Sequence, residues 1–201
     1  MKTRAFAFAA LILLFAAPLI AQDAETLFSG ELEHGGFGGP VIKAGQINGS
    51  PGLFVGGRGG WIVNHSLILG GGGYGLVNNV DALVPGLYGA RYVEFGYGGF
   101  EIEYVNRWDQ LIHWSVMVLV GGGGVGYRSV DDEVLGFDPP HQTDEVFVAE
   151  PSVQVNLNVT EFFRISAGAS YRYVSGVTSP ATSNEKLSGG SGVLTLRFGK
   201  F

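Results

Sequence analysis

The chain has 201 residues, a formal net charge of −6 and no cysteine. The acidic balance lacks the basic footprint of a nucleic-acid-binding protein, and the lack of cysteine excludes a disulfide framework, a thiolate site and a lipid anchor on cysteine. The composition combines 34 glycines with a positive mean hydropathy of +0.24 and shows no collagen period. It is therefore not that of a disordered chain and favours tightly curved β-sheet.

The N-terminus, residues 1–21, has the pattern of a secretory signal peptide. Lys2 and Arg4 supply the positive charge, Ala5 to Leu14 form an apolar run, and Leu19-Ile20-Ala21 approximates a cleavage site. Residues 22–34 are acidic and aperiodic, and we interpret them as a periplasmic lead-in. No later apolar run approaches the ~18 residues of a membrane-spanning helix, which excludes a helical inner-membrane protein. Residues 35–201 are predicted to form a single β-domain.

Eight segments of this domain have the character of β-strands, and none has a sustained helical period. They are Gly36–Gln46, Leu53–Asn64, Ser66–Asn78, Tyr92–Val105, Ile112–Arg128, Val146–Asn158, Phe163–Val174 and Gly192–Phe201. The connections alternate in length: those near residues 65 and 160 are short and 106–111 is moderate, whereas 79–90, 129–145 and 175–191 are long. Only the first connection, around residues 48–51, is a short member of the long class. Outer-membrane barrels have an even strand number, short periplasmic turns and longer external loops.

The sequence therefore predicts an all-β fold: an eight-stranded antiparallel up-and-down transmembrane β-barrel with its long loops outside. The segment FRISAGASYRYV, residues 163–174, shows the expected alternation most clearly. One parity is apolar and aromatic, and the other carries Arg164, Ser166, Ser170 and Arg172. Successive side chains of a strand point to opposite faces, so one face is expected in lipid and the other in a polar lumen.

Aromatic residues gather near the ends of the predicted strands, as in the interfacial belts of membrane proteins. The predicted belt comprises Trp61, Tyr104, Trp108, Trp114, Phe163, Tyr171, Tyr173 and Phe198. All three tryptophans of the chain lie beside the predicted periplasmic turns.

Charged residues within the strands are predicted to face the lumen, because an Arg or Lys on the lipid face near mid-membrane is destabilising by about 2–4 kcal/mol. This lumen cluster comprises Arg58, Glu101, Glu103, Glu150, Arg164, Arg172 and Arg197. We expect Arg58 to pair with Glu150 centrally, and Arg164 or Arg197 to pair with Glu101 or Glu103 nearer the turns. Eight strands leave an interior only just wide enough for side chains. A polar plug is therefore favoured over a selective pore.

By this pattern the chain resembles the small eight-stranded outer-membrane barrels, the class of the outer-membrane protein A transmembrane domain. The resemblance covers residues 35–201 and no residue motif is diagnostic of one protein. It implies that the terminal Phe201 acts as an assembly signal read by the barrel-assembly machinery. Leu194, Leu196 and Phe198 alternate ahead of it, although Phe201 lies on the opposite parity. The implied partners are outer-membrane lipids and lipopolysaccharide, and the implied state is a monomer with neither cofactor nor metal.

The primary functional hypothesis is a non-catalytic structural protein of the bacterial outer membrane that presents mobile loops for adhesion or ligand contact. One alternative is an outer-membrane lipid hydrolase using His113 and Ser115, which share a strand face and occur as His-x-Ser in lipid A deacylases. Another is a soluble periplasmic barrel that carries a small apolar ligand. Both alternatives differ from the primary hypothesis in the surroundings that they predict for Tyr171 and Ile165, which are lipid, water or protein.

Two further motifs favour structural interpretations. The glycine patterns at residues 70–75 and 121–126 match a dinucleotide fingerprint, but neither precedes a predicted helix that would hold a pyrophosphate. Residues 131–145 contain six carboxylates that could ligate a divalent cation, although the order and central glycine of a dedicated calcium loop are missing. We interpret the glycines as strand residues and the acidic segment as a solvated external loop.

Overall fold

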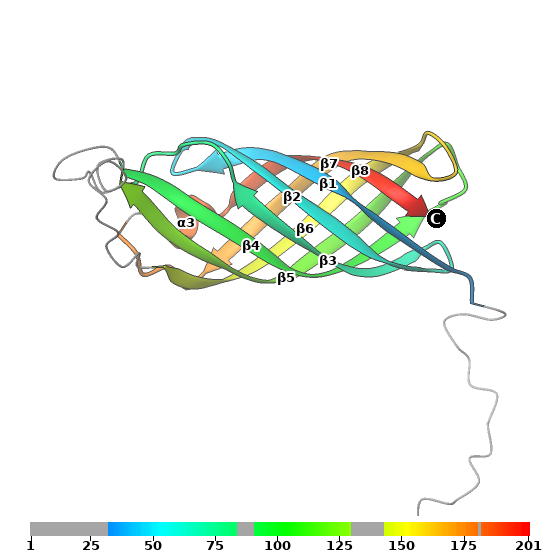
Figure 1. Ribbon diagram of the computed structural model, residues 1–201, viewed down its shortest axis with the longest axis horizontal. Helices are drawn as coiled ribbons and strands as arrows, with labels where there is room; N and C mark the ends of the chain where they lie inside the picture. Colours follow the sequence, from blue (N-terminus) through cyan, green and yellow to red (C-terminus); the bar gives the residue numbers. More distant parts are fainter. Residues whose placement is uncertain (1–31, 84–90, 130–142, 181) are drawn as a thin grey trace, which may run out of the picture. The chain divides into compact units, whose positions relative to one another are not determined.

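The computed structural model describes residues 32–83, 91–129, 143–180 and 182–201. Its eight strands form one closed antiparallel barrel in which each strand pairs with its neighbours in sequence and β1 closes onto β8 (Figure 1). The strands are β1 His34–Ile47, β2 Ser50–Val63, β3 Leu67–Leu76, β4 Arg91–Asn106, β5 Ile112–Ser129, β6 Asp144–Asn158, β7 Phe163–Ser175 and β8 Gly189–Lys200. The predicted fold class is confirmed, and each predicted strand corresponds to an observed one.

The boundaries differ by a few residues. β3 ends at Leu76 rather than Asn78, and β8 begins at Gly189, three residues before its predicted start. The connection of β1 to β2 is a two-residue turn with positive φ at Asn48 (52°) and Gly49 (81°). Asn-Gly is the favoured pair for such hairpins, because both residues tolerate the left-handed conformation. The predicted signal peptide and most of the lead-in lie outside the described residues.

The two ends of the barrel differ, as the connection lengths predicted. The short turns after β2, β4 and β6 lie at one end together with the C-terminus, and we call this the turn end (Figure 1). The other end, the loop end, carries the connections after β1, β3, β5 and β7. A four-residue helix, α3 Asn184–Leu187, lies in the last of these and was not predicted. Its Ser183 cap accepts a hydrogen bond from the Lys186 N–H, which is a local signal for one helical turn.

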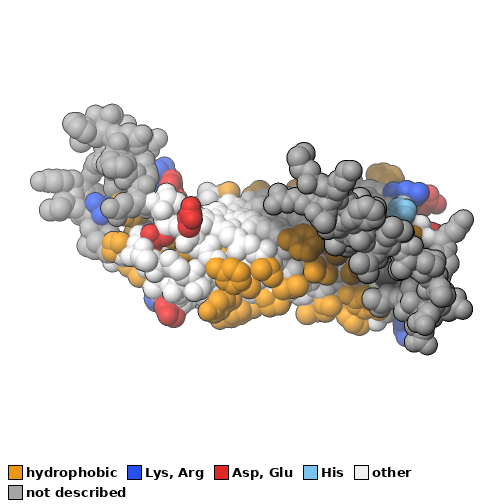
Figure 2. All heavy atoms as spheres, turned by 90° about the horizontal axis from the view of Figure 1, so that it is seen from below, with side chains coloured by type: hydrophobic (Ala, Val, Ile, Leu, Met, Phe, Trp, Pro, Cys, Tyr) orange, Lys and Arg blue, Asp and Glu red, His pale blue; other side chains and the backbone are white. Residues whose placement is uncertain are grey.

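Hydrophobic side chains cover much of the outer wall. Figure 2 shows them across the middle of one side, with charged side chains toward the two ends. The exposed apolar residues on the strands include Ile42, Val55, Phe100, Ile102, Val118, Val120, Phe147, Val153, Val155 and Leu194. Within the part of the chain that the structure describes, no helix is long and apolar enough to cross a bilayer.

The glycine patterns 70–75 and 121–126 both lie inside strands, β3 and β5. Neither leads into a helix, so the structural interpretation of these glycines holds. Gly72 shows what such a residue does inside the barrel: a Cβ there would come within 2.5 Å of Glu101 Oε1 and 2.6 Å of Tyr74 Oη. Glycine therefore makes room for two long polar side chains in a narrow interior.

Candidate functional site in the barrel interior

Alternation along the strands places charged side chains inside the barrel. On β7, Arg164, Ser166, Ser170 and Arg172 are all buried, whereas Tyr171 and Tyr173 between and beyond them are 55% and 53% exposed. The predicted lumen charges have exposures of 9% or less: Arg58, Glu101, Glu103, Glu150, Arg164, Arg172 and Arg197. Because a buried charge is stable only when it is paired and hydrogen-bonded, the partners of these groups define the site.

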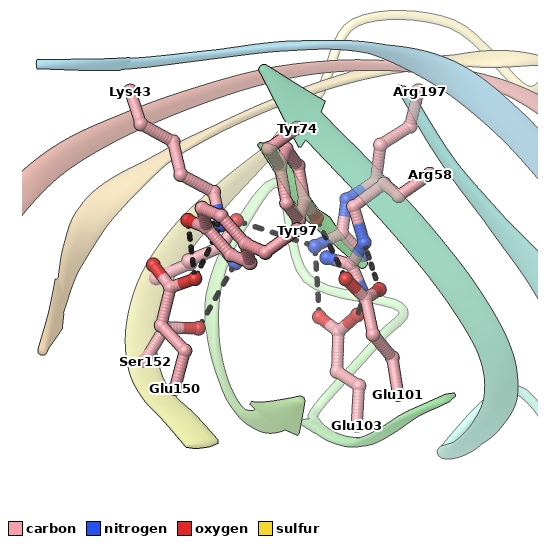
Figure 3. A network of polar contacts seen from close by, with 10 residues as sticks. Lys43, Arg58, Tyr74, Tyr97, Glu101, Glu103, Glu150, Ser152 and Arg197 are labelled. Atoms are coloured by element: carbon pink, nitrogen blue, oxygen red, sulfur yellow. Dashed lines mark hydrogen bonds and ion pairs between the residues drawn. The ribbon is translucent and has the colours of Figure 1, made fainter. Parts of the chain in front are cut away.

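One charge cluster lies toward the turn end and joins four strands (Figure 3). Arg58 binds two carboxylates, with Nε 2.7 Å from Glu101 Oε2 and Nη2 2.9 Å from Glu103 Oε2. Glu103 also accepts from Arg197 Nη2 at 2.8 Å. Tyr74 Oη donates to Glu101 Oε1 at 2.6 Å. We call these five residues the arginine cluster.

The second cluster is centred on Glu150, which lies on β6. Its Oε2 is 2.7 Å from Lys43 Nζ and also accepts from Tyr97 Oη at 2.7 Å. Its Oε1 accepts from Ser170 Oγ at 2.6 Å. The Lys43 ammonium also lies 3.3 Å from the centroid of the Tyr74 ring, a cation–π contact that links the two clusters. We call Lys43, Tyr97, Glu150 and Ser170 the lysine cluster; Figure 3 shows the first three of these residues.

The predicted pairing of Arg58 with Glu150 is wrong. Arg58 binds Glu101 and Glu103 on β4, and Glu150 binds Lys43 on β1. Arg197 binds Glu103, which is one of the expected pairings, whereas none of the described carboxylates forms an ion pair with Arg164. Two charge layers exist, but their members differ, because strand twist and register set which side chains meet across the interior.

Sequence reasoning missed Lys43, Tyr74 and Tyr97. Tyr97 shares its parity with Glu101 and Glu103 on the same strand, so alternation could have placed it inside. Lys43 lies on the parity of Val41 and opposite to Ile42, which is 46% exposed. Alternation of apolar and polar residues is weak in a strand rich in glycine. The inward direction of Lys43 follows from the pairing of β1 with β2 and β8.

The interior is not polar throughout, which corrects the expectation of a polar lumen. A large apolar cluster that includes Phe54, Val93, Phe95, Val148 and Val174 fills the part toward the loop end. Val80 and Leu187, from the connections after β3 and β7, are buried in this cluster at 1% and 0% exposure. The loop end is therefore covered by apolar side chains that the loops contribute.

Hydrogen bonds hold these loops over the barrel mouth. Asn48 donates to the Asp81 carbonyl at 3.0 Å and accepts from Thr182 Oγ1 at 2.6 Å. Asp144 accepts from the backbone N–H and the hydroxyl of Thr178, at 2.7 and 2.8 Å. The short turn between β1 and β2 thus ties two longer connections together. The described connections at the loop end are therefore fixed to the barrel by hydrogen bonds as well as by apolar packing.

Arg172 lies beneath this cover. It is fully buried, its Nε donates to the Leu187 carbonyl at 2.8 Å, and its guanidinium lies 4.5 Å from the Phe54 ring centroid. Within the described ranges, neither terminal nitrogen, Nη1 or Nη2, has a hydrogen-bond partner. Stacking on an aromatic ring compensates part of the desolvation of the guanidinium.

Most residues of the predicted aromatic belt point outward. Trp61, Tyr104, Trp114, Tyr171, Tyr173 and Phe198 are 45% exposed or more, and Phe163 stacks on Phe198 with centroids 4.8 Å apart. Trp108 differs: it stacks on His65 at 3.9 Å and packs against a small apolar cluster inside the turn end. It lies in a turn rather than in a strand, so alternation does not apply to it.

Phe201 also lies at the turn end, where its ring packs with Phe37 at 6.2 Å. Phe201 has the same parity as Arg197, whose side chain points inward, as the sequence indicates. The role of Phe201 in assembly stays a prediction.

His113 and Ser115 are both buried on the interior face of β5, with exposures of 5% and 0%. Ser115 Oγ accepts a hydrogen bond from Asn156 Nδ2 at 3.1 Å, and Asn156 in turn accepts from Ser166. His113 Nδ1 lies 3.0 Å from the Gln110 carbonyl oxygen. The serine is thus part of a polar ladder across β5, β6 and β7. Within the described ranges no group of acidic or histidine side chains could hold a metal ion, and the carboxylates at residues 131–138 lie outside them.

The closed barrel with an apolar wall and buried ion pairs defines a class: it is the fold of the small eight-stranded outer-membrane β-barrels. No family model and no curated protein sequence matches the chain. Among solved structures, Neisserial surface protein A matches with a TM-score of 0.56 and 14% identity, over 86% of this chain and 100% of that one. The attachment invasion locus protein Ail of Yersinia pestis, in complex with the heparin analogue sucrose octasulfate, matches with a TM-score of 0.50 and 14% identity. That match covers 85% of this chain and 99% of Ail.

Proposed function

We propose that this protein is a monomeric outer-membrane barrel of a Gram-negative bacterium, without catalytic activity, that presents its loop end to the outside. The arrangement of polarity carries the proposal: the outer wall is apolar, and the charged residues lie inside, where every buried carboxylate of the described residues is paired with a cation. In water such a wall would be an exposed hydrophobic patch far larger than soluble monomers tolerate. In a bilayer the same wall contacts acyl chains, and the closed ladder leaves no unpaired strand edge.

This reasoning disfavours a soluble ligand carrier, since Tyr171 points outward and is 55% exposed. It also disfavours a lipid hydrolase. A lipid substrate would approach the outer wall, whereas Ser115 is fully buried and engaged with Asn156 inside. Nucleophilic catalysis further requires a base within hydrogen-bond reach of the hydroxyl, and the partner of His113 is the Gln110 carbonyl.

In its membrane, the barrel would have the lipid chains and lipopolysaccharide of the outer membrane as neighbours, and the barrel-assembly machinery as a transient partner. We assign the protein a structural function in the envelope. The more specific hypothesis is that the loop end serves adhesion or ligand contact. Ail was solved in complex with the heparin analogue sucrose octasulfate. The acidic composition of residues 131–145 in this chain is unfavourable for a sulfated polymer, so our proposal does not include that ligand.

The first test is fractionation combined with gel mobility. We expect the mature protein to partition with outer membranes and to migrate faster before boiling than after it, because a closed barrel resists unfolding by detergent. The Glu103→Gln variant serves as a destabilised control whose fast-migrating form should be lost at a lower temperature. Recovery of the native protein from the soluble periplasm without detergent would contradict the proposal.

The second test addresses orientation. Glu185, at the loop end, and Glu161, in the turn between β6 and β7, are both exposed. The chain has no cysteine, so single replacements Glu185→Cys and Glu161→Cys give unambiguous sites. We expect a membrane-impermeant maleimide to label Glu185→Cys on intact cells and to label Glu161→Cys only after the outer membrane is permeabilised. The reverse pattern would show that the turn end faces outward.

A further inference from the structure

The turn end contains a pocket of about 580 Å³. Its walls come from all three short turns, from Glu33 ahead of β1, from Arg164 on β7 and from the last two residues of the chain. Pockets for small molecules have volumes of roughly 300–1,000 Å³, with a few polar groups that fix the orientation of the ligand. The size and composition of this pocket therefore suit a small molecule.

Arg164 is an uncompensated cation in the wall of this pocket. Its side chain is nine-tenths buried, with 9% exposure, and its Nε has no hydrogen-bond partner in the part of the chain that the structure describes. The guanidinium lies 4.1 Å from the centroid of the Phe201 ring, which fixes its plane. Directly opposite in the β7–β8 ladder lies Arg197, whose Nη2 binds Glu103. Like charges that face each other across a ladder are destabilising, so this arrangement favours binding of an anion.

The balance of charge inside the barrel leads to the same conclusion. Among the described residues the buried cations are Lys43, Arg58, Arg164, Arg172 and Arg197, and the buried carboxylates are Glu101, Glu103 and Glu150. Every one of these carboxylates is engaged by Lys43, Arg58 or Arg197. Arg164 and Arg172 are thus in excess, and of these two only Arg164 lines the turn-end pocket.

Asn158 contributes an unpartnered acceptor to the same pocket. Its Nδ2 donates to the carbonyls of Trp108 and Gln110, at 3.0 and 2.9 Å, and these bonds fix the orientation of the amide. Its Oδ1 is buried and has no hydrogen-bond partner among the residues that the structure describes. A buried acceptor without a partner is unfavourable, and a cationic group bound nearby lowers that penalty.

We propose that the turn-end pocket binds a small zwitterion of the amino-acid or dipeptide type. Its carboxylate pairs with the Arg164 guanidinium, whose planar donors match a carboxylate. Its ammonium lies beside Asn158 and the carboxylates of Asp109 and Glu161. Trp108 and Phe201 in the wall provide apolar contact for the rest of the ligand. Asp109 and Glu161 also line the pocket, and their charges favour a ligand with an ammonium group over a polyanion.

The test uses the full mature chain folded in detergent micelles, with the dipeptide Ala-Ala as the probe. Two blocked probes separate its charges: N-acetyl-Ala-Ala lacks the ammonium and Ala-Ala amide lacks the carboxylate. Binding is followed by amide chemical shifts in NMR titrations. We expect Ala-Ala to bind more tightly than either blocked form, and to shift the amides of the turn end rather than those of the loop end.

The variant Arg164→Gln should weaken Ala-Ala binding by about tenfold or more, because it removes a charge-assisted hydrogen-bond pair. In this variant Ala-Ala and its amide should bind about equally. Arg172→Gln is the matched control, because it removes the other excess arginine, which is sealed beneath the loops, and should leave binding unchanged. Gel mobility before boiling verifies that each variant is folded.

Three outcomes would overturn the proposal. They are the absence of Ala-Ala binding by folded wild-type protein at tens of millimolar, equal affinity for all three probes, and unchanged affinity in folded Arg164→Gln. The measurement uses isolated protein, so its outcome does not depend on the membrane location or orientation proposed above.

Discussion

Replacing Glu103 with glutamine is expected to lower the free energy of unfolding by about 3–5 kcal/mol, the range found when one partner of a buried ion pair is removed. Glu103 is fully buried and binds two arginines, Arg58 at 2.9 Å and Arg197 at 2.8 Å. Without the Glu103 charge, Arg197 loses its ion-pair partner while it faces Arg164 across the β7–β8 ladder. The measurement is reversible urea unfolding of the barrel in lipid vesicles.

Glu101→Gln is the matched control for this experiment. Glu101 lies on the same face of β4 two residues away and binds Arg58, but Arg58 retains Glu103 when Glu101 is neutralised. The neutral amide can still accept the hydrogen bond from Tyr74. We therefore expect Glu101→Gln to be less destabilising than Glu103→Gln. Equal effects, or a loss below about 1 kcal/mol for Glu103→Gln, would show that water reaches the arginine cluster and screens it.

The second large effect is expected in the lysine cluster, where a double-mutant cycle measures the pair directly. Lys43→Met and Glu150→Gln should each be destabilising by roughly 3–5 kcal/mol, because each leaves its partner buried without a counter-charge. The double variant should be less destabilised than the sum of the two single variants, with a coupling energy of about 1–3 kcal/mol. In Lys43→Met, Tyr97 and Ser170 still donate hydrogen bonds to Glu150, which reduces the loss in the free energy of unfolding.

A second cycle distinguishes the observed pairing from the one that the sequence predicted. Arg58 and Glu150 belong to different clusters and share no hydrogen bond. The cycle of Arg58→Met with Glu150→Gln should therefore give a coupling energy within about 0.5 kcal/mol of zero. A coupling as large as that of Lys43 with Glu150 would contradict the arrangement in Figure 3.

The packing of the interior favours a plug over a pore. The charged side chains are tied to one another and are covered toward the loop end by Phe54, Phe95 and Leu187. This arrangement supports a structural interior rather than a conduction path. Arg172 fits this account, because its guanidinium stacks on Phe54 inside the cover.

The sequence alone determined the number of strands, their order and the inward face of several of them. These features are local: alternation has a period of two residues, and turn length depends on a few consecutive residues. The parity of residues 163–174 placed Arg164 and Arg172 on one face of the strand, and both side chains are buried. The parity argument failed for Trp108, which lies in a turn, and it gave no clear answer for Lys43 in a glycine-rich strand.

Only the tertiary structure decided which charges meet. Arg58 lies 43 residues from Glu101, and Lys43 lies 107 residues from Glu150, so no local pattern relates them. Their contacts depend on the register of all eight strands and on closure of β1 onto β8. The apolar cover at the loop end and the pocket at the turn end arise in the same way. Each is built from connections that are distant in the chain and are brought together because the barrel closes.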